Sequence, residues 1–159
     1  MNMLKKIKFM ACALALSAAI LSAGCTVARS DGGNATEDNM TVYITVGEES
    51  AEIKLGSGNA AQQLAERLAE GDIVYAADDY GGFEKVGALG FSLPRSDERI
   101  TTQPGDVMLY QGDSIVIFYG SNSWAYTPLG RIQGLAQQDL RELLQAGRGQ
   151  VQVTLSLFR

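Results

Sequence analysis

The sequence predicts a mainly β domain in which about eight strands close into a barrel accompanied by two helices. Three observations lead to this fold class. Segments in which apolar and polar residues alternate recur along residues 41–159, as in half-buried strands. Helical spacing of apolar residues occurs in two segments, 59–71 and 135–147. Strands this numerous in a short chain need closure to avoid exposed edges, and a barrel provides it.

The first 24 residues have the pattern of an export signal. Three lysines precede an apolar run over residues 9–21, and small residues lead to Cys25. This order of basic, apolar and small residues is typical of a signal peptide. The apolar run is shorter than the ~20 residues that a membrane-spanning helix needs, so we expect residues 1–24 to be removed.

The segment "LSAGC", residues 21–25, resembles the lipobox of bacterial lipoproteins, in which the cysteine receives lipid. It departs from the pattern because Ser22 stands where Leu is usual and Leu21 lies one step further back. The sequence therefore predicts lipidation of Cys25 and an extracytoplasmic domain anchored to the bacterial cell membrane. The alternative is an ordinary secretory signal that leaves a free thiol.

The expected mature chain is acidic and has at most one cysteine. Cys12 leaves with the signal, so an internal disulfide is excluded and the core must hold the domain together. The remaining 10 basic and 18 acidic side chains give a net charge of −8, which argues against a nucleic-acid partner. Residues 25–40 are polar and aperiodic, as expected of a flexible tether, and residues 41–159 form the barrel domain.

The domain begins with a predicted hairpin, followed by a helix. Residues 41–46 and 51–55 alternate on either side of a polar turn at 47–50. In residues 59–71, Asn59 is a candidate N-cap, Gln62 completes a capping box, and Gly71 ends the helix.

The middle of the domain contains further strands. We expect them near residues 72–77, 83–89 and 99–102, and then in a hairpin formed by 107–110 and 115–119. The two runs of this hairpin lack alternation, so both faces must be covered. We expect the barrel interior to cover one face and a helix or a pocket to cover the other. The second helix, near 135–147, precedes a final alternating strand at 150–158.

Two long segments carry a family resemblance. The stretches "YGGFEKVGALGFSLPRSD" and "TTQPGDVMLYQGDSIVIFYGSNSWAYTPLGRI", with the closing helix and strand, resemble the cyclophilin-like domain of many bacterial proteins. Several of these are lipoproteins, and some are joined to a flavodoxin-like unit. The resemblance spans residues 40–159 and implies a closed eight-stranded barrel with two helices. Relatives carry Arg where Pro128 stands and often His at Arg131, so one possible ligand contact is missing.

The resemblance also suggests peptidyl-prolyl isomerase activity, which we keep as an alternative. True cyclophilins use an Arg that donates to the prolyl nitrogen in the twisted transition state, an electrostatic effect that needs no nucleophile or metal. The Phe and Arg close together on one strand, with Gln shortly after, are absent from this sequence. Arg95 and Arg99 lie in a loop where solvated charges are expected, and Arg131 is a candidate pocket residue.

Other chemistry has little support. Without histidine and with Cys25 lipidated, the usual bases and soft metal ligands are missing. The acidic pairs 78–79 and 97–98 lack an EF-hand spacing and are expected to be loop charges. We therefore expect no metal and no cofactor.

Aromatic residues in the family segments predict a binding module for a small molecule or an extended peptide. The alternative is that these aromatic side chains only pack in the core. We favour core packing for Phe118 and Tyr119, and we weigh core and pocket equally for Trp124. A second alternative is a docking domain for an envelope redox partner. The candidate ligand-binding residues are Tyr80, Phe83, Phe91, Arg95, Tyr110, Asn122, Trp124 and Arg131.

Overall fold

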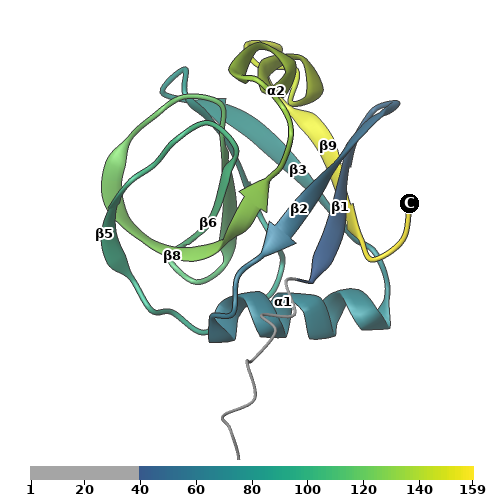
Figure 1. Ribbon diagram of the computed structural model, residues 1–159, viewed down its shortest axis with the longest axis vertical. Helices are drawn as coiled ribbons and strands as arrows, with labels where there is room; N and C mark the ends of the chain where they lie inside the picture. The colour runs from purple at the N-terminus through teal and green to yellow at the C-terminus, as the bar shows by residue number, and fades with distance from the viewer. Residues whose placement is uncertain (1–39) are drawn as a thin grey trace, which may run out of the picture. The chain divides into compact units, whose positions relative to one another are not determined.

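The computed structural model describes residues 40–159, which fold into nine strands and two helices (Figure 1). The predicted signal peptide, Cys25 and all of the tether except Met40 lie outside the described residues. No helix within residues 40–159 is both long and apolar enough to cross a membrane. The elements are β1 (Thr41–Val46), β2 (Glu49–Leu55), α1 (Asn59–Glu70), β3 (Ile73–Tyr80), β4 (Glu84–Ala88), β5 (Glu98–Thr101), β6 (Asp106–Tyr110), β7 (Ser114–Phe118), β8 (Ser123–Ile132), α2 (Gln137–Leu143) and β9 (Val151–Ser156).

Eight of the strands form a closed antiparallel barrel, as predicted. Their order is β2-β1-β9-β3-β4-β7-β6-β8, and β8 pairs back onto β2 to close the ring. At this closure Gly130 lies opposite Leu55, so close that an added Cβ would collide with the Lys54 carbonyl oxygen. A residue without a side chain is therefore needed where the first and last strands of the ring meet.

The alternation of the first hairpin places one set of side chains in the barrel. Val42, Ile44 and Val46 are fully buried, whereas the residues between them are partly exposed. Val46 pairs with Glu49, so the turn has two residues and is shorter than the sequence suggested. Gly47 adopts the positive φ of 62° that this tight connection requires.

The two helices lie at opposite ends of the barrel (Figure 1). Both bury apolar residues in the barrel core, Leu64 and Leu68 from α1 and Leu140 and Leu143 from α2. The helices therefore close the ends of the barrel and do not cover its outer wall. The expectation of a helix over the outward face of the hairpin at 107–119 is wrong.

The predicted capping box of the first helix is also wrong. The N-cap is Gly58, with no side-chain hydrogen bond, and Asn59 is already helical. The Gln62 side chain donates instead to the Ser57 carbonyl oxygen at 3.1 Å.

Both faces of the β6–β7 hairpin are buried, as its sequence requires. Val107, Leu109, Ile115 and Ile117 join the barrel core, while Met108, Val116 and Phe118 belong to a second cluster with Tyr126. The second cluster lies on the outer wall of the barrel, and the cover is a strand rather than a helix.

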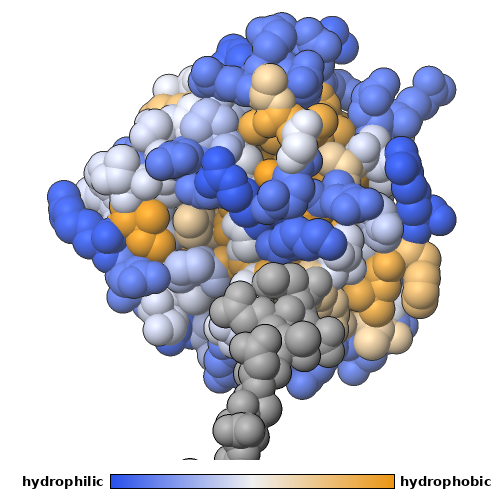
Figure 2. All heavy atoms as spheres, viewed as in Figure 1, coloured by the Kyte–Doolittle hydropathy of each residue, from blue (hydrophilic) through white to orange (hydrophobic). Residues whose placement is uncertain are grey.

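This cover consists of β5 and the first half of β8. β8 pairs with β6 over residues 127–131 and with β5 over residues 123–126, and the register shifts next to Pro128. Proline has no N–H for a regular ladder, and β8 changes partner from β5 to β6 just before it, between Tyr126 and Thr127. In Figure 1, β5 and β8 curve around the side of the barrel near β6. The face in Figure 2 is mostly hydrophilic, with hydrophobic residues in separate areas.

Candidate functional site

A pocket with a volume of about 400 Å³ opens on the outer wall of the barrel, beneath the start of β8. Its walls come from β3, β4, β6 and β8 and from the connection before β8. The lining residues are Tyr80, Glu84, Val86, Tyr110, Asn122, Trp124 and Tyr126. The pocket combines four aromatic residues with one carboxyl and one carboxamide group.

Strand pairing explains why these residues meet. Glu84 pairs with Tyr80 of β3 on one side and with Phe118 of β7 on the other. Val86 pairs with Val116, two residues further along the same face. Since residues two apart on a strand point to the same side, Glu84 and Val86 share the outer face with the second cluster.

Aromatic contacts hold the inner end of the pocket in place. The Tyr126 ring packs edge-on against Phe118 at a centroid distance of 5.4 Å and lies 6.1 Å from Tyr110. Tyr126 is 3% exposed. At the mouth, Tyr80 and Trp124 are 64% and 54% exposed, and Tyr80 packs edge-on against Phe83. The pocket therefore has a packed aromatic interior and two accessible aromatic side chains at its mouth.

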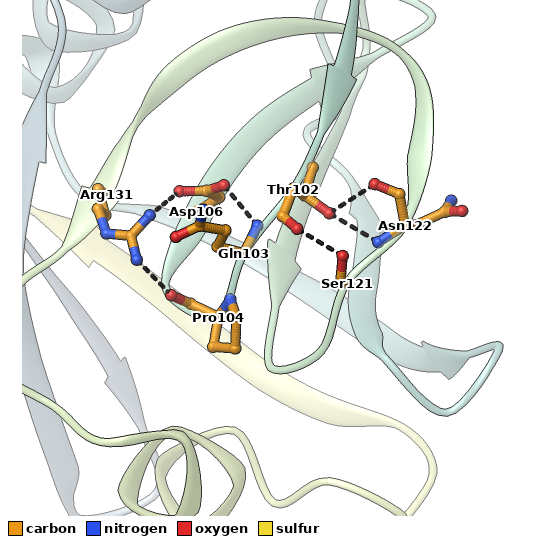
Figure 3. A network of polar contacts seen from close by, with 7 residues as sticks. All are labelled: Thr102, Gln103, Pro104, Asp106, Ser121, Asn122 and Arg131. Atoms are coloured by element: carbon orange, nitrogen blue, oxygen red, sulfur yellow. Dashed lines mark hydrogen bonds and ion pairs between the residues drawn. The ribbon is translucent and has the colours of Figure 1, made fainter.

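Asn122 is held by a polar network that Figure 3 shows. The Thr102 N–H and hydroxyl donate to the Asn122 carbonyl oxygen at 2.8 and 3.1 Å, and the Asn122 N–H donates to the Thr102 hydroxyl at 3.0 Å. The Ser121 hydroxyl donates to the Thr102 carbonyl oxygen at 2.7 Å. The Asn122 side-chain amide donates to the Tyr126 hydroxyl at 3.0 Å. The network thus fixes both the backbone and the side chain of Asn122 against the pocket.

Glu84 is the most unusual residue of the pocket. Its side chain is only 6% exposed, and its Oε2 atom has no hydrogen-bond partner. Burial raises the pKa of its carboxyl to about 7, since desolvation disfavours the charged form. A buried acceptor without a donor is rare in proteins, so a buried carboxyl beside an open pocket is a candidate ligand contact.

The neighbouring residue, Lys85, does not neutralise Glu84. Lys85 is also buried, but its Nζ lies 2.9 Å from Asp79 Oδ2 and donates to the Gly149 carbonyl oxygen. Asp79 also accepts hydrogen bonds from the Tyr119 hydroxyl and from the N–H groups of Gly147 and Gly149. Burial opposes ionisation of Asp79, but these hydrogen bonds lower its pKa. Lys85 therefore serves a separate network near α2.

The structure brings together four of the eight predicted site residues: Tyr80, Tyr110, Asn122 and Trp124. Trp124 thus lines the pocket, whereas Tyr119 lies in the barrel core and Phe118 in the second cluster. Phe83 lies beside the pocket and packs against the second cluster. The remaining three predicted residues lie elsewhere.

Those three residues have other contacts. Phe91 packs against the barrel core, and the Arg67 guanidinium lies 5.2 Å from its ring centroid. Arg95 pairs with Asp97 and is exposed. Arg131 lies at the barrel closure, where it pairs with Asp106 and donates to the Pro104 carbonyl oxygen at 2.8 Å (Figure 3). None of these three residues therefore lines the pocket.

The sequence did not point to Glu84 or Val86 as site residues. Tyr126 belongs to the aromatic residues whose clustering predicted a pocket, although it was not among the eight candidate ligand-binding residues. Glu84 carried no visible signal, because a glutamate between a phenylalanine and a lysine in a strand suggests a solvent-facing position. Across residues 40–159, no three acidic, histidine or cysteine side chains are placed to hold a metal ion.

Comparison with known proteins settles the family. The model of the cyclophilin-like family matches residues 44–156. The chain belongs to the cyclophilin-like family. Among solved structures, the cyclophilin-like barrel is similar to the solution structure of the hypothetical protein AF2241 from Archaeoglobus fulgidus. The TM-score is 0.59 at 16% identity, and the alignment covers 79% of this chain and 99% of that one. This likeness supports the fold alone. The search of curated proteins finds no match.

Proposed function

We propose that this cyclophilin-like domain is a non-catalytic binding module whose pocket on the outer barrel wall takes a small molecule or part of an extended peptide. The observation that carries the proposal is the buried carboxyl of Glu84, which has an unpartnered oxygen and lines a pocket walled by aromatic rings. Ligand sites are typically concave and apolar with a few placed polar groups. The Glu84 pocket has these properties, and its volume of about 400 Å³ suits a small ligand or a single side chain.

The pocket gives little support to the alternative, prolyl isomerisation. Stabilising the twisted peptide bond requires a donor aimed at the prolyl nitrogen, and cyclophilins supply a guanidinium. None of the described residues that line the pocket is Arg or Lys. Arg131 is occupied at the barrel closure. A carboxylate in place of a guanidinium has the wrong charge for this role.

A test of the proposed function can use Trp124, which is the single tryptophan of the chain and lines the pocket. We expect ligands found in a screen of small molecules and short peptides, Ala-Pro peptides included, to shift Trp124 fluorescence and amide resonances near residues 119–131. Val86→Phe should fill the pocket and abolish the response. Val74→Phe, an exposed β3 position outside the lining, is the matched control. If no ligand class perturbs these residues, the pocket is not a binding site.

We also propose that the domain is held at the outer side of a bacterial cell membrane by lipid on Cys25. The support is the order of basic, apolar and small residues before Cys25. The intact mass of the protein purified from membranes should exceed that of residues 25–159 by a diacylglyceryl group and any further acyl chain. Cys25→Ser should release the protein from membranes. A native mass equal to the unmodified chain would contradict the anchor.

A further inference from the structure

We infer that the ligand of the Glu84 pocket is a small organic cation with a primary or secondary ammonium group, bound by Glu84 between the aromatic rings. The inference rests on the proposed function of the same pocket and adds the chemical class of the ligand. It follows from the charge of the lining, the missing donor at Glu84 and the arrangement of the rings.

The lining favours a positive charge. Among the residues that line the pocket, Glu84 is the one acidic residue, and none is Lys or Arg. The titratable groups that surround Glu84 there are the hydroxyls of Tyr80, Tyr110 and Tyr126, and the neighbouring Lys85 is paired with Asp79. Above pH 7, where the Glu84 carboxyl is ionised, an anion would meet a buried carboxylate without compensation, and a neutral ligand would leave that charge unpaired. A cation resolves both problems, because burying a charge is favourable only with a partner.

The rings add a second attraction for a cation. The faces of tyrosine and tryptophan attract cations within about 6 Å of the ring centroid, and ammonium groups are often held in aromatic cages. Four such residues line this pocket. The ring centroids of two of them, Tyr110 and Tyr126, lie 6.1 Å apart at its inner end. Trp124 and Tyr80 remain exposed at the mouth, where they can cover the apolar part of the ligand.

The unpartnered oxygen selects the type of cation. Glu84 Oε2 is a buried acceptor that lacks a donor, so its best complement is an N–H group that carries positive charge. A primary or secondary ammonium supplies such a group, and a quaternary ammonium does not. The volume of about 400 Å³ lies at the lower end of the range for ligand pockets, which favours a small amine over a longer chain.

A series of probes with one common ring tests the inference by titration of Trp124 fluorescence and amide resonances at pH 8. Benzylammonium should bind at least tenfold more tightly than benzyl alcohol and benzyltrimethylammonium, and benzoate should not bind. A short peptide that contains lysine tests whether the ligand is a lysine side chain or a free small amine. We expect this peptide to bind more weakly than benzylammonium. Tighter binding of the lysine peptide would overturn the assignment to a small amine.

Two variants with the same change of charge complete the test. Glu84→Gln keeps the shape of the side chain and should weaken benzylammonium binding at least tenfold, with little effect on benzyl alcohol. Glu98→Gln, an exposed position on β5 opposite Tyr126 and outside the pocket lining, should change either affinity less than twofold. Tyr126→Phe offers a second pocket variant that should fold and keep the preference for the cation.

The outcomes separate the two claims. Equal binding of benzylammonium and benzyl alcohol, or equal loss in both Gln variants, would overturn the cation inference while leaving a binding pocket. If none of the probes perturbs Trp124 or its neighbours, and a broad ligand screen also fails, the proposed function is wrong as well.

Discussion

Replacing Glu84 with Gln should change how the stability of the domain depends on pH. The pKa of the Glu84 carboxyl is about 7 in the folded protein, compared with an ordinary value of 4.5. Between these values the carboxyl ionises in the unfolded chain but stays protonated in the folded domain, so rising pH favours unfolding. At 1.36 kcal/mol for each pH unit, the free energy of unfolding should fall by about 3 kcal/mol between pH 4.5 and 7 and then level off.

Urea unfolding of the wild type and Glu84→Gln at intervals from pH 4 to pH 8 measures this effect. Gln does not titrate, so the wild type should lose about 3 kcal/mol relative to the variant over this range. The other titrating groups cancel in the difference. Glu66→Gln, an exposed position on α1, should show a nearly constant difference from the wild type. A difference for Glu84→Gln that stays constant within about 0.5 kcal/mol would refute burial of an unpaired carboxyl.

Three further substitutions test other parts of the structure by urea unfolding. Gly130→Ala should destabilise the domain by about 2 kcal/mol or more through overpacking at the barrel closure. Gly56→Ala should have a smaller effect, because its added Cβ would lie 3.8 Å from the nearest atom, the Leu129 carbonyl oxygen; equal effects would contradict the closure. Lys85→Met should lower the free energy of unfolding by about 3 kcal/mol because Asp79 loses its cation. A decrease below about 1 kcal/mol would mean that the Lys85–Asp79 pair is effectively solvated. Thr102→Val should lower the free energy of unfolding by about 1 to 3 kcal/mol and weaken ligand binding. An unchanged affinity would show that the hydrogen bonds between Thr102 and Asn122 do not position the pocket.

The barrel could be predicted from the sequence because its signals are local. Alternation in β1 and β2, and the absence of alternation in β6 and β7, report which faces of each strand are buried. The cover of the outer wall could not be predicted, since it depends on β8 changing its partner from β5 to β6 near Pro128. Nothing in a single segment indicates which strand will pair with it.

The site was only half predictable for a similar reason. Tyr110, Asn122 and Trp124 belong to aromatic and polar segments that suggested a pocket. Glu84 and Lys85 are adjacent and point to different surroundings, yet both are buried because both faces of β4 are covered. Alternation alone assigns one of two adjacent charged residues to solvent, so it hides a buried carboxyl of this kind.

The most direct test of the proposed site is a ¹³C NMR titration of the Glu84 side-chain carboxyl, with and without saturating benzylammonium. We predict a pKa of about 7 in the free protein and a clearly lower pKa with the cation, since a bound positive charge favours the carboxylate. A pKa near the ordinary value of 4.5 that the cation does not change would contradict both the buried carboxyl and its role in ligand recognition.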